Sequence, residues 1–195
     1  MVAPMPGVAL APRAFVFGKL PRHGDFVARG LEPEARAAWD DCLAGQMDAA
    51  RDRLGADFAA MHGSAPPWRF CLGPGRFGSR WQAGCVAPSV DAAGRTFFIV
   101  VGGQTPQGLA NSLAESVAQS LESLLYDALQ SAWDTDTLLA AAQGVWDHCP
   151  VGTHPPPAAV MADRWWIGET AISIRQFPRS LIDPLAEDPV MQAGL

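Results

Sequence analysis

Apolar residues in the first third of the chain follow a strand-like pattern and then a helical one. The apolar and aromatic run 14–17 is stopped by Gly18, which is typical of a buried strand. After Pro33, a residue tolerated in the first turn of a helix, apolar residues recur every three or four positions. These positions are Trp39, Leu43, Met47, Ala50, Leu54, Phe58 and Met61. Because Gly45 and Gly55 each weaken a helix by about 1 kcal/mol, the pattern predicts two helices or one bent helix.

The period changes between residues 63 and 103. Three short runs, 68–72, 81–87 and 96–101, are rich in aromatic and β-branched residues. They are separated by GPGRFGS and PSVDAAG, which are turn compositions. The pattern predicts a three-stranded antiparallel meander.

A second helical pattern follows the meander. Thr105 and Pro106 form a good N-cap and first-turn pair, and a long apolar stripe continues to about Trp133. The stripe consists of Leu109, Leu113, Val117, Leu121, Leu124, Leu125 and Ala128. A shorter helix is predicted over residues 136–146.

The last predicted elements are two short strands, 158–161 and 165–168, that form a closing hairpin. Sequential hairpins with long helices between them indicate an α+β fold, a mainly antiparallel sheet with amphipathic helices packed against it. We predict a single domain over residues 14–177, a flexible leader over 1–13 and an irregular tail over 178–195.

Composition and charge exclude several classes of function. The 14 Lys and Arg against 20 Asp and Glu leave a formal charge of −6, the wrong sign for a protein that binds nucleic acid through its phosphates. No apolar run approaches the roughly 18 residues of a membrane helix, and the first twelve residues do not have the pattern of a signal peptide. We therefore expect a cytoplasmic protein without a nucleic-acid partner and without membrane insertion.

The cysteines and histidines predict no disulfide and no metal site. The four cysteines lie far apart, without the dense spacing of small secreted domains, so we expect reduced, mostly buried thiols. They are Cys42, Cys71, Cys85 and Cys149. His148 and Cys149, with His154 beyond them, lack the second ligand pair that a structural zinc site needs.

Motifs of the common catalytic sites are missing from the sequence. Lys19 does not belong to a phosphate-binding loop, because Arg13 and Leu20 stand where that loop needs Gly and Ser or Thr. There is no GxSxG elbow, no HExxH and no GxGxxG fingerprint. We predict a protein that is not an enzyme and that uses no cofactor.

The densest polar cluster lies between the first strand and the first helix, in the loop 18–26. Loops held by a rigid scaffold commonly carry binding residues, so this loop is a candidate partner-binding surface. Its candidate residues are Lys19, Pro21, Arg22, His23, Asp25 and Phe26. In the alternative interpretation the loop is only a connection, in which Asp25 bonds local amides and the glycines serve turns.

Two other patterns carry candidate residues. Successive side chains of a strand point to opposite faces, so one of Trp165 and Trp166 enters the core and the other needs a second layer, a groove or a partner. A helix on the second face is the more ordinary outcome, and both tryptophans are also candidate partner-binding residues. Asp91 and Gly94 in PSVDAAGR are typical of an Asx-type turn.

Four blocks of sequence together resemble the TagF family, also called ImpM, associated with bacterial type VI secretion. The blocks are GKLPRHGDFVARGL (18–31), APPWRF (65–70), AGCVAPSVDAAGRTFF (83–98) and RWWIGE (164–169). The resemblance implies a cytoplasmic accessory protein, not a catalyst, that represses assembly of the secretion apparatus after translation. It also implies a partner, a scaffold protein with a forkhead-associated domain.

One alternative from another functional class stays open. A small hydrolase or phosphatase could use Lys19, Arg22, His23 and Asp25 as anion-binding and acid–base groups, and Asp91 could contribute to them. A pocket that joins these four side chains would favour that alternative, whereas a flat or convex surface would disfavour it.

Overall fold

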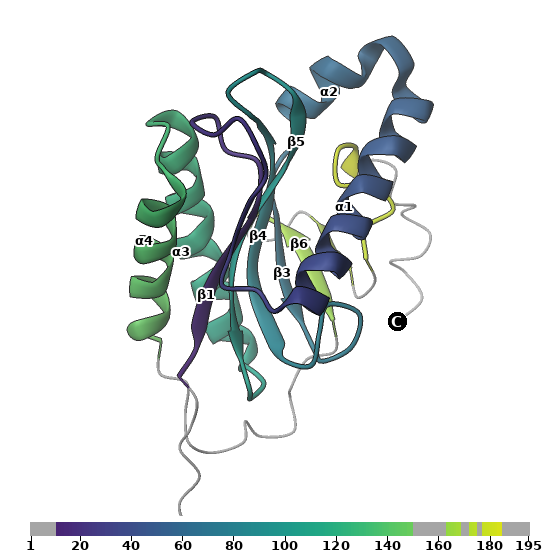
Figure 1. Cartoon of the computed structure of the whole chain (residues 1–195). Coiled ribbons are helices and arrows are strands. Elements are labelled where there is room, and N and C mark those ends of the chain that lie inside the picture. The colour runs from purple at the N-terminus through teal and green to yellow at the C-terminus, as the bar shows by residue number, and fades with distance from the viewer. Residues whose placement is uncertain (1–10, 150–162, 169–171, 175–176, 185–195) are drawn as a thin grey trace, which may run out of the picture.

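The computed structural model describes residues 11–149, 163–168, 172–174 and 177–184. Figure 1 shows a central sheet with α3 and α4 on one face and α1 and α2 on the other. In chain order the elements are β1 (Arg13–Gly18), β2 (Val27–Arg29), α1 (Pro33–Leu54), η1 (Gly55–Asp57), α2 (Phe58–Ser64), β3 (Trp68–Leu72), β4 (Trp81–Val90), β5 (Thr96–Thr105), α3 (Asn111–Gln130), α4 (Thr135–Asp147), β6 (Arg164–Ile167) and β7 (Ile172–Ile174). The predicted α+β fold is confirmed.

The sheet has seven strands in the order β2-β1-β5-β4-β3-β6-β7, and every neighbouring pair is antiparallel. The predicted meander corresponds to β3, β4 and β5, although β4 and β5 extend further than expected, to Val90 and Thr105. The sequence pattern stopped β5 at Gly102 and Gly103. Both glycines remain in the sheet because the rings of Phe15 and Trp146 occupy the space that a Cβ would need.

The predicted N-cap at Thr105 is wrong. Thr105 is the fully buried last residue of β5, and its Oγ1 accepts a hydrogen bond from the Gln107 amide at 3.2 Å. The helix α3 begins six positions later along the chain, at Asn111, with Ala110 as its N-cap. A Thr-Pro pair is also common in turns, and here the threonine ends β5 and the turn follows it.

Each face of the sheet has its own hydrophobic core. Along β1, Ala14 and Val16 belong to the core under α3 and α4, whereas Phe15 and Phe17 belong to the aromatic core under α1. Because helices cover both faces, β1 reads as a continuous apolar run without an exposed polar face.

The first helical pattern forms two helices, which is one of the two outcomes predicted, and the break lies at Gly55. This glycine has φ +52°, a backbone conformation that favours glycine, and it ends α1. Gly45 lies inside α1 without interrupting it. On the other face, α3 presents its predicted apolar stripe to the sheet and α4 packs apolar side chains beside it. Asp134 caps α4 by accepting a hydrogen bond from the Thr137 amide.

The end of the chain completes the sheet and the aromatic core. β6 pairs with β7 and also with β3, which the sequence did not indicate. The predicted strand 158–161 lies outside the described residues. Leu181 and Ile182, beyond the predicted boundary at residue 177, are buried in the core under α1. No helix within the described ranges is long and apolar enough to cross a membrane.

Candidate functional site

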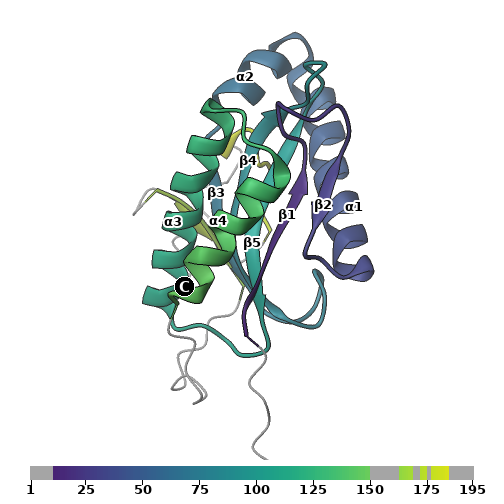
Figure 2. The same cartoon turned by 60° about the vertical axis from the view of Figure 1, so that its left-hand side comes forward.

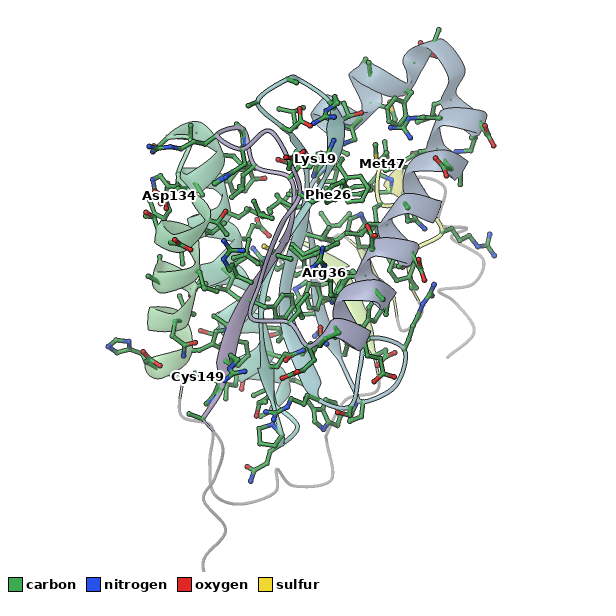
Figure 3. All side chains as sticks on the ribbon, in the orientation of Figure 1. Lys19, Phe26, Arg36, Met47, Asp134 and Cys149 are labelled. Atoms are coloured by element: carbon green, nitrogen blue, oxygen red, sulfur yellow. The ribbon has the colours of Figure 1, made fainter. Side chains whose placement is uncertain are left out.

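The loop 18–26 joins β1 to β2 at one end of the sheet. Figure 3 shows Lys19 and Phe26 beside each other on this loop, with Asp134 at the same end of the molecule. Gly18 begins the loop with φ +128°, and a Cβ there would lie 2.1 Å from the carbonyl oxygen of Phe98. The Lys19 amide then donates to that same oxygen at 3.0 Å. Only glycine allows this close approach of the loop to β5.

Lys19 is buried and forms an ion pair with a residue from a distant turn. Its Nζ lies 3.0 Å from Oδ2 of Asp91, in the turn between β4 and β5, and 5.3 Å from the centre of the Phe26 ring. The side chain of Lys19 is 9% exposed and that of Asp91 is fully buried. The ammonium group is therefore occupied inside the molecule and is not directed at solvent.

Asp91 organises its own turn as well as the loop. Its Oδ1 accepts hydrogen bonds at 2.9 Å from the amides of Ala93 and Arg95, which confirms the predicted Asx-type turn, and Gly94 has φ +76°. Its Oδ2 also lies 2.7 Å from Nε of Arg95. Burial alone would raise the pKa of the Asp91 carboxyl, but the hydrogen bonds from Arg95, Lys19 and Ala93 hold that pKa well below its usual range.

His23 connects the loop to two other elements. Its Nε2 lies 3.2 Å from the backbone nitrogen and 3.1 Å from Oγ1 of Thr135, the first residue of α4. Its carbonyl oxygen accepts the amide of Ala92 at 2.9 Å. Because a backbone amide can only donate, Nε2 accepts this hydrogen bond.

Asp25 and Phe26 form the exposed tip of the loop. No other described residue hydrogen-bonds the Asp25 carboxylate. The Phe26 ring is 45% exposed, yet it packs against Phe17 at 6.3 Å and Phe97 at 4.7 Å between ring centres. Phe26 is thus an exposed aromatic side chain held in a fixed position by the core beneath it.

An open depression of about 290 Å³ lies between the loop, β2 and the N-terminus of α4. Of the predicted loop residues, His23, Asp25 and Phe26 line it, while Lys19, Pro21 and Arg22 do not. The remaining lining residues are Gly24, Val27, Arg29, Asp134, Thr135 and Asp136. The depression therefore joins two of the four side chains that a hydrolase would need.

Trp165 and Trp166 are both buried, 1% and 3% exposed, and they lie in different cores. Trp165 contacts Trp39 and Phe70 in the core under α1, and Trp166 belongs to the core under α3 and α4. The predicted opposite orientation is confirmed, with a helix layer on the second face. Neither ring offers an exposed face to a partner.

Three residues of the site come from distant parts of the chain: Asp91, Asp134 and Thr135. Asp91 was recognisable as a turn residue, but a single sequence gives no signal that it pairs with Lys19, more than seventy positions earlier. The N-cap role of Asp134 follows a readable pattern, since Asp just before an apolar stripe is a common cap. Its position beside His23 depends on the sheet topology.

The described cysteine and histidine side chains form neither a disulfide nor a metal-binding group. All four cysteines are free, and Cys42, Cys71 and Cys85 are buried. Within the described ranges, no group of three or more His, Cys, Asp or Glu side chains could hold a metal ion. His154 lies outside those ranges.

Comparison with known proteins gives a matching family model and similar solved structures. Residues 16–145 match the family model described as TagF N-terminal domain, Type VI secretion system-associated. The fold is similar to the crystal structure of PA0076 from Pseudomonas aeruginosa PAO1, with a TM-score of 0.68 and 26% sequence identity, over 87% of this chain and 91% of that chain. None of the curated proteins compared with this sequence is similar to it.

Proposed function

Because this chain belongs to the TagF N-terminal domain family of type VI secretion system-associated proteins, we propose that it restrains assembly of the secretion apparatus by binding a partner protein. The resemblance of its sequence blocks implies that the partner is a cytoplasmic scaffold with a forkhead-associated domain. The tip of the loop 18–26 is the surface through which it binds.

Phe26 is the observation that carries this proposal. Exposed aromatic side chains that are rigid before binding are typical centres of protein interfaces, because little conformational entropy is lost when they are covered. Phe26 is such a side chain, held by Phe17 and Phe97 and by the buried ammonium of Lys19. Asp25 beside it has no hydrogen bond to another described residue and is free to pair with a partner.

The contacts of the polar loop residues favour binding over catalysis. Lys19 is held by Asp91, away from the depression, and Nε2 of His23 is occupied by the Thr135 amide. A hydrolase would need these groups directed at a substrate, within about 3 Å of the reacting atoms. We therefore place the hydrolase alternative second. It predicts turnover of phosphate or ester substrates that disappears in His23→Ala.

Binding of the purified scaffold tests the proposal directly. Phe26→Ala should weaken binding by about tenfold to a hundredfold, as expected for a central aromatic side chain. Tyr126→Ala on α3 is the matched control, because Tyr126 is 47% exposed and lies outside the loop. Equal affinity of wild type and Phe26→Ala, with both variants folded, would remove the loop from the interface.

Secretion in the bacterium tests the regulatory role. Deleting the gene should increase release of effectors into the medium, and overproducing the protein should suppress assembly of the secretion sheath. Overproduced Phe26→Ala should suppress assembly less than overproduced Tyr126→Ala. Unchanged release after both deletion and overproduction, with an active apparatus, would contradict the proposed function.

A further inference from the structure

β1 has an outer edge that β2 covers only in part. β2 pairs with Val16, Phe17 and Gly18, whereas β5 pairs with all six residues of β1 on the other side. Figure 2 shows β2 beside the upper part of β1 only. Gly30, directly after β2, still lies against this edge, since a Cβ there would be 2.1 Å from the carbonyl oxygen of Ala14. Beyond Gly30, no strand within the described ranges pairs with the backbone of Pro12 to Ala14 on this side, so a strand could be added there.

A glutamine side chain occupies the place of the missing strand. Oε1 of Gln143 on α4 accepts the amide of Ala14 at 2.8 Å, and its Nε2 donates to the carbonyl oxygen of Pro12 at 3.1 Å. Nε2 also donates to Oδ1 of Asp147 at 2.8 Å, which fixes the orientation of the amide. One side-chain amide thus supplies the donor and the acceptor that an antiparallel strand would direct at this edge.

There is room for a chain beside this edge. A hollow of about 360 Å³ lies between β1 and α4. It is lined by Arg13, Ala14, Gly30, Asp136, Leu139, Ala140 and Gln143. Leu139, Ala140 and Ala14 make much of the lining apolar, so small apolar side chains fit there.

We propose that the edge of β1 at Pro12–Ala14 is a strand-addition site that Gln143 holds closed. The segment it accepts is an extended peptide of a partner protein, running antiparallel to β1. We call the residue of this segment that faces Arg13 its central residue. The residue before it supplies the carbonyl oxygen that accepts the Ala14 amide, and the residue after it supplies the amide that donates to the Pro12 carbonyl oxygen. These two residues point into the hollow and are small and apolar.

The central residue of the added segment is acidic. It lies opposite Arg13, whose side chain is 68% exposed and whose nearest carboxylate oxygen, on Glu32, is 3.9 Å away. Opposite charges on directly facing strand positions are favourable, and like charges are unfavourable. A second copy of this chain is a poor occupant, since its own Arg13 would face Arg13.

The synthetic tetrapeptide Val-Glu-Val-Thr-amide is the probe, and it begins at the residue that faces Ala14 because Gly30 occupies the position that faces Phe15. Gln143→Ala removes the side-chain amide that competes with the peptide for Ala14 and Pro12. This variant should bind the peptide about tenfold more tightly than wild type, because the peptide no longer has to displace that amide. Methylating the backbone nitrogen of the second valine deletes the donor to Pro12 and should weaken binding by about tenfold. In Arg13→Glu the Val-Lys-Val peptide should bind better than the Val-Glu-Val peptide. Gln119→Ala, an exposed glutamine on α3, is the control and should bind as wild type does.

Several outcomes would overturn the proposal. One is that Gln143→Ala does not bind the peptide at millimolar concentration, or dimerises in place of binding it. Another is that the methylated and unmethylated peptides bind with equal affinity, or that wild type and Gln143→Ala bind the peptide with equal affinity. If Gln143→Ala does not fold, wild type decides the question. Its Ala14 amide resonance must shift with the unmethylated peptide at millimolar concentration and stay unshifted with the methylated one. None of these measurements involves the scaffold, so they stand or fall independently of the proposed function.

Discussion

The ammonium nitrogen of Lys19 lies 3.0 Å from Oδ2 of Asp91, although the two residues come from different turns of the sheet. Both side chains are almost completely buried, so each charge remains in the protein interior only because the other is beside it. The pair fastens the loop 18–26 to the turn between β4 and β5. The exposed Phe26 ring packs beside the ammonium group of Lys19 in this ion pair.

Removing one partner of this pair should destabilise the protein clearly. Lys19→Met leaves the Asp91 carboxylate buried with fewer partners, so the melting temperature should fall by several degrees. Asp48→Asn, which breaks the exposed pair between Asp48 and Arg51, should leave the melting temperature nearly unchanged. Thermal melts of the two variants at neutral pH make the comparison. Equal melting temperatures would mean that the buried pair has no net effect on stability.

The pH dependence of Asp91 follows from its lowered pKa. A carboxyl whose pKa is lower in the folded state contributes stability above its unfolded pKa, about 3.9, and loses that contribution as the pH falls toward the folded value. The stability difference between wild type and Asp91→Asn should therefore be constant from pH 7 to pH 5 and shrink only below about pH 4. Urea unfolding across this range is the measurement. A difference that disappears between pH 7 and pH 5 would contradict the lowered pKa.

His62 should make the protein less stable in mild acid. Its ring is buried with Nε2 2.7 Å from the carbonyl oxygen of Phe97, and burial lowers its pKa. The unfolded chain then takes up a proton at a higher pH than the folded chain, so the free energy of unfolding falls as the pH drops below about 6.5. His62→Gln should reduce the difference in stability between pH 7.5 and pH 5.5. His148→Gln, at an exposed position, is the control and should keep that difference.

Two glycines should respond in opposite ways to alanine. At Gly103 a Cβ would lie 2.2 Å from the indole ring of the buried Trp146, and the strand packing leaves no space for it, so Gly103→Ala should cost about 1–3 kcal/mol. At Gly144, inside α4, a Cβ would meet nothing within 4 Å, so Gly144→Ala should stabilise the protein by up to about 1 kcal/mol. The free energies of unfolding in urea measure both. Destabilisation by Gly144→Ala would show that the space beside α4 is not open.

The periodicity of apolar residues predicted most helices and strands because each element has to face a core. It named Gly55, together with Gly45, as a possible break, and it predicted the opposite orientations of Trp165 and Trp166, which depend only on local geometry. It ended β5 too early at Gly102, because a strand can carry glycines wherever a large ring packs against its backbone. It did not predict β2, whose three residues are too few to show a period.

The candidate site was less predictable because its contacts are long-range. The polar loop 18–26 was visible as a cluster, and Phe26 and Asp25 are exposed in it as binding residues need to be. The partner of Lys19, however, depends on which turn the sheet topology places beside the loop. The same is true of His23, whose contact with Thr135 joins residues more than one hundred positions apart.

The thiols should differ in reactivity according to their burial. Burial raises the pKa of Cys42 to about 11 and that of Cys71 to about 12, and it raises the pKa of Cys85 well above its usual value. Burial also raises the pKa of Cys149, but this thiol is only half-buried and is therefore the most accessible of the four. A thiol reagent at pH 8 should modify Cys149 first and the other three only after unfolding, with four free thiols in total. Two free thiols in the denatured, unreduced protein would contradict the absence of a disulfide.

The pairing of β6 with β3 determines when the protein can fold during its synthesis. Trp165 and the buried residues Leu181 and Ile182 complete the aromatic core around Trp39, and the indole nitrogen of Trp68 donates to the Leu181 carbonyl oxygen at 3.2 Å. Until these residues have been synthesised, Trp39 of α1 and Trp68 of β3 lack part of the apolar surface that buries them in the folded protein. The aromatic core under α1 is therefore complete only after the segment with Trp165, Leu181 and Ile182 has been synthesised and has paired with β3.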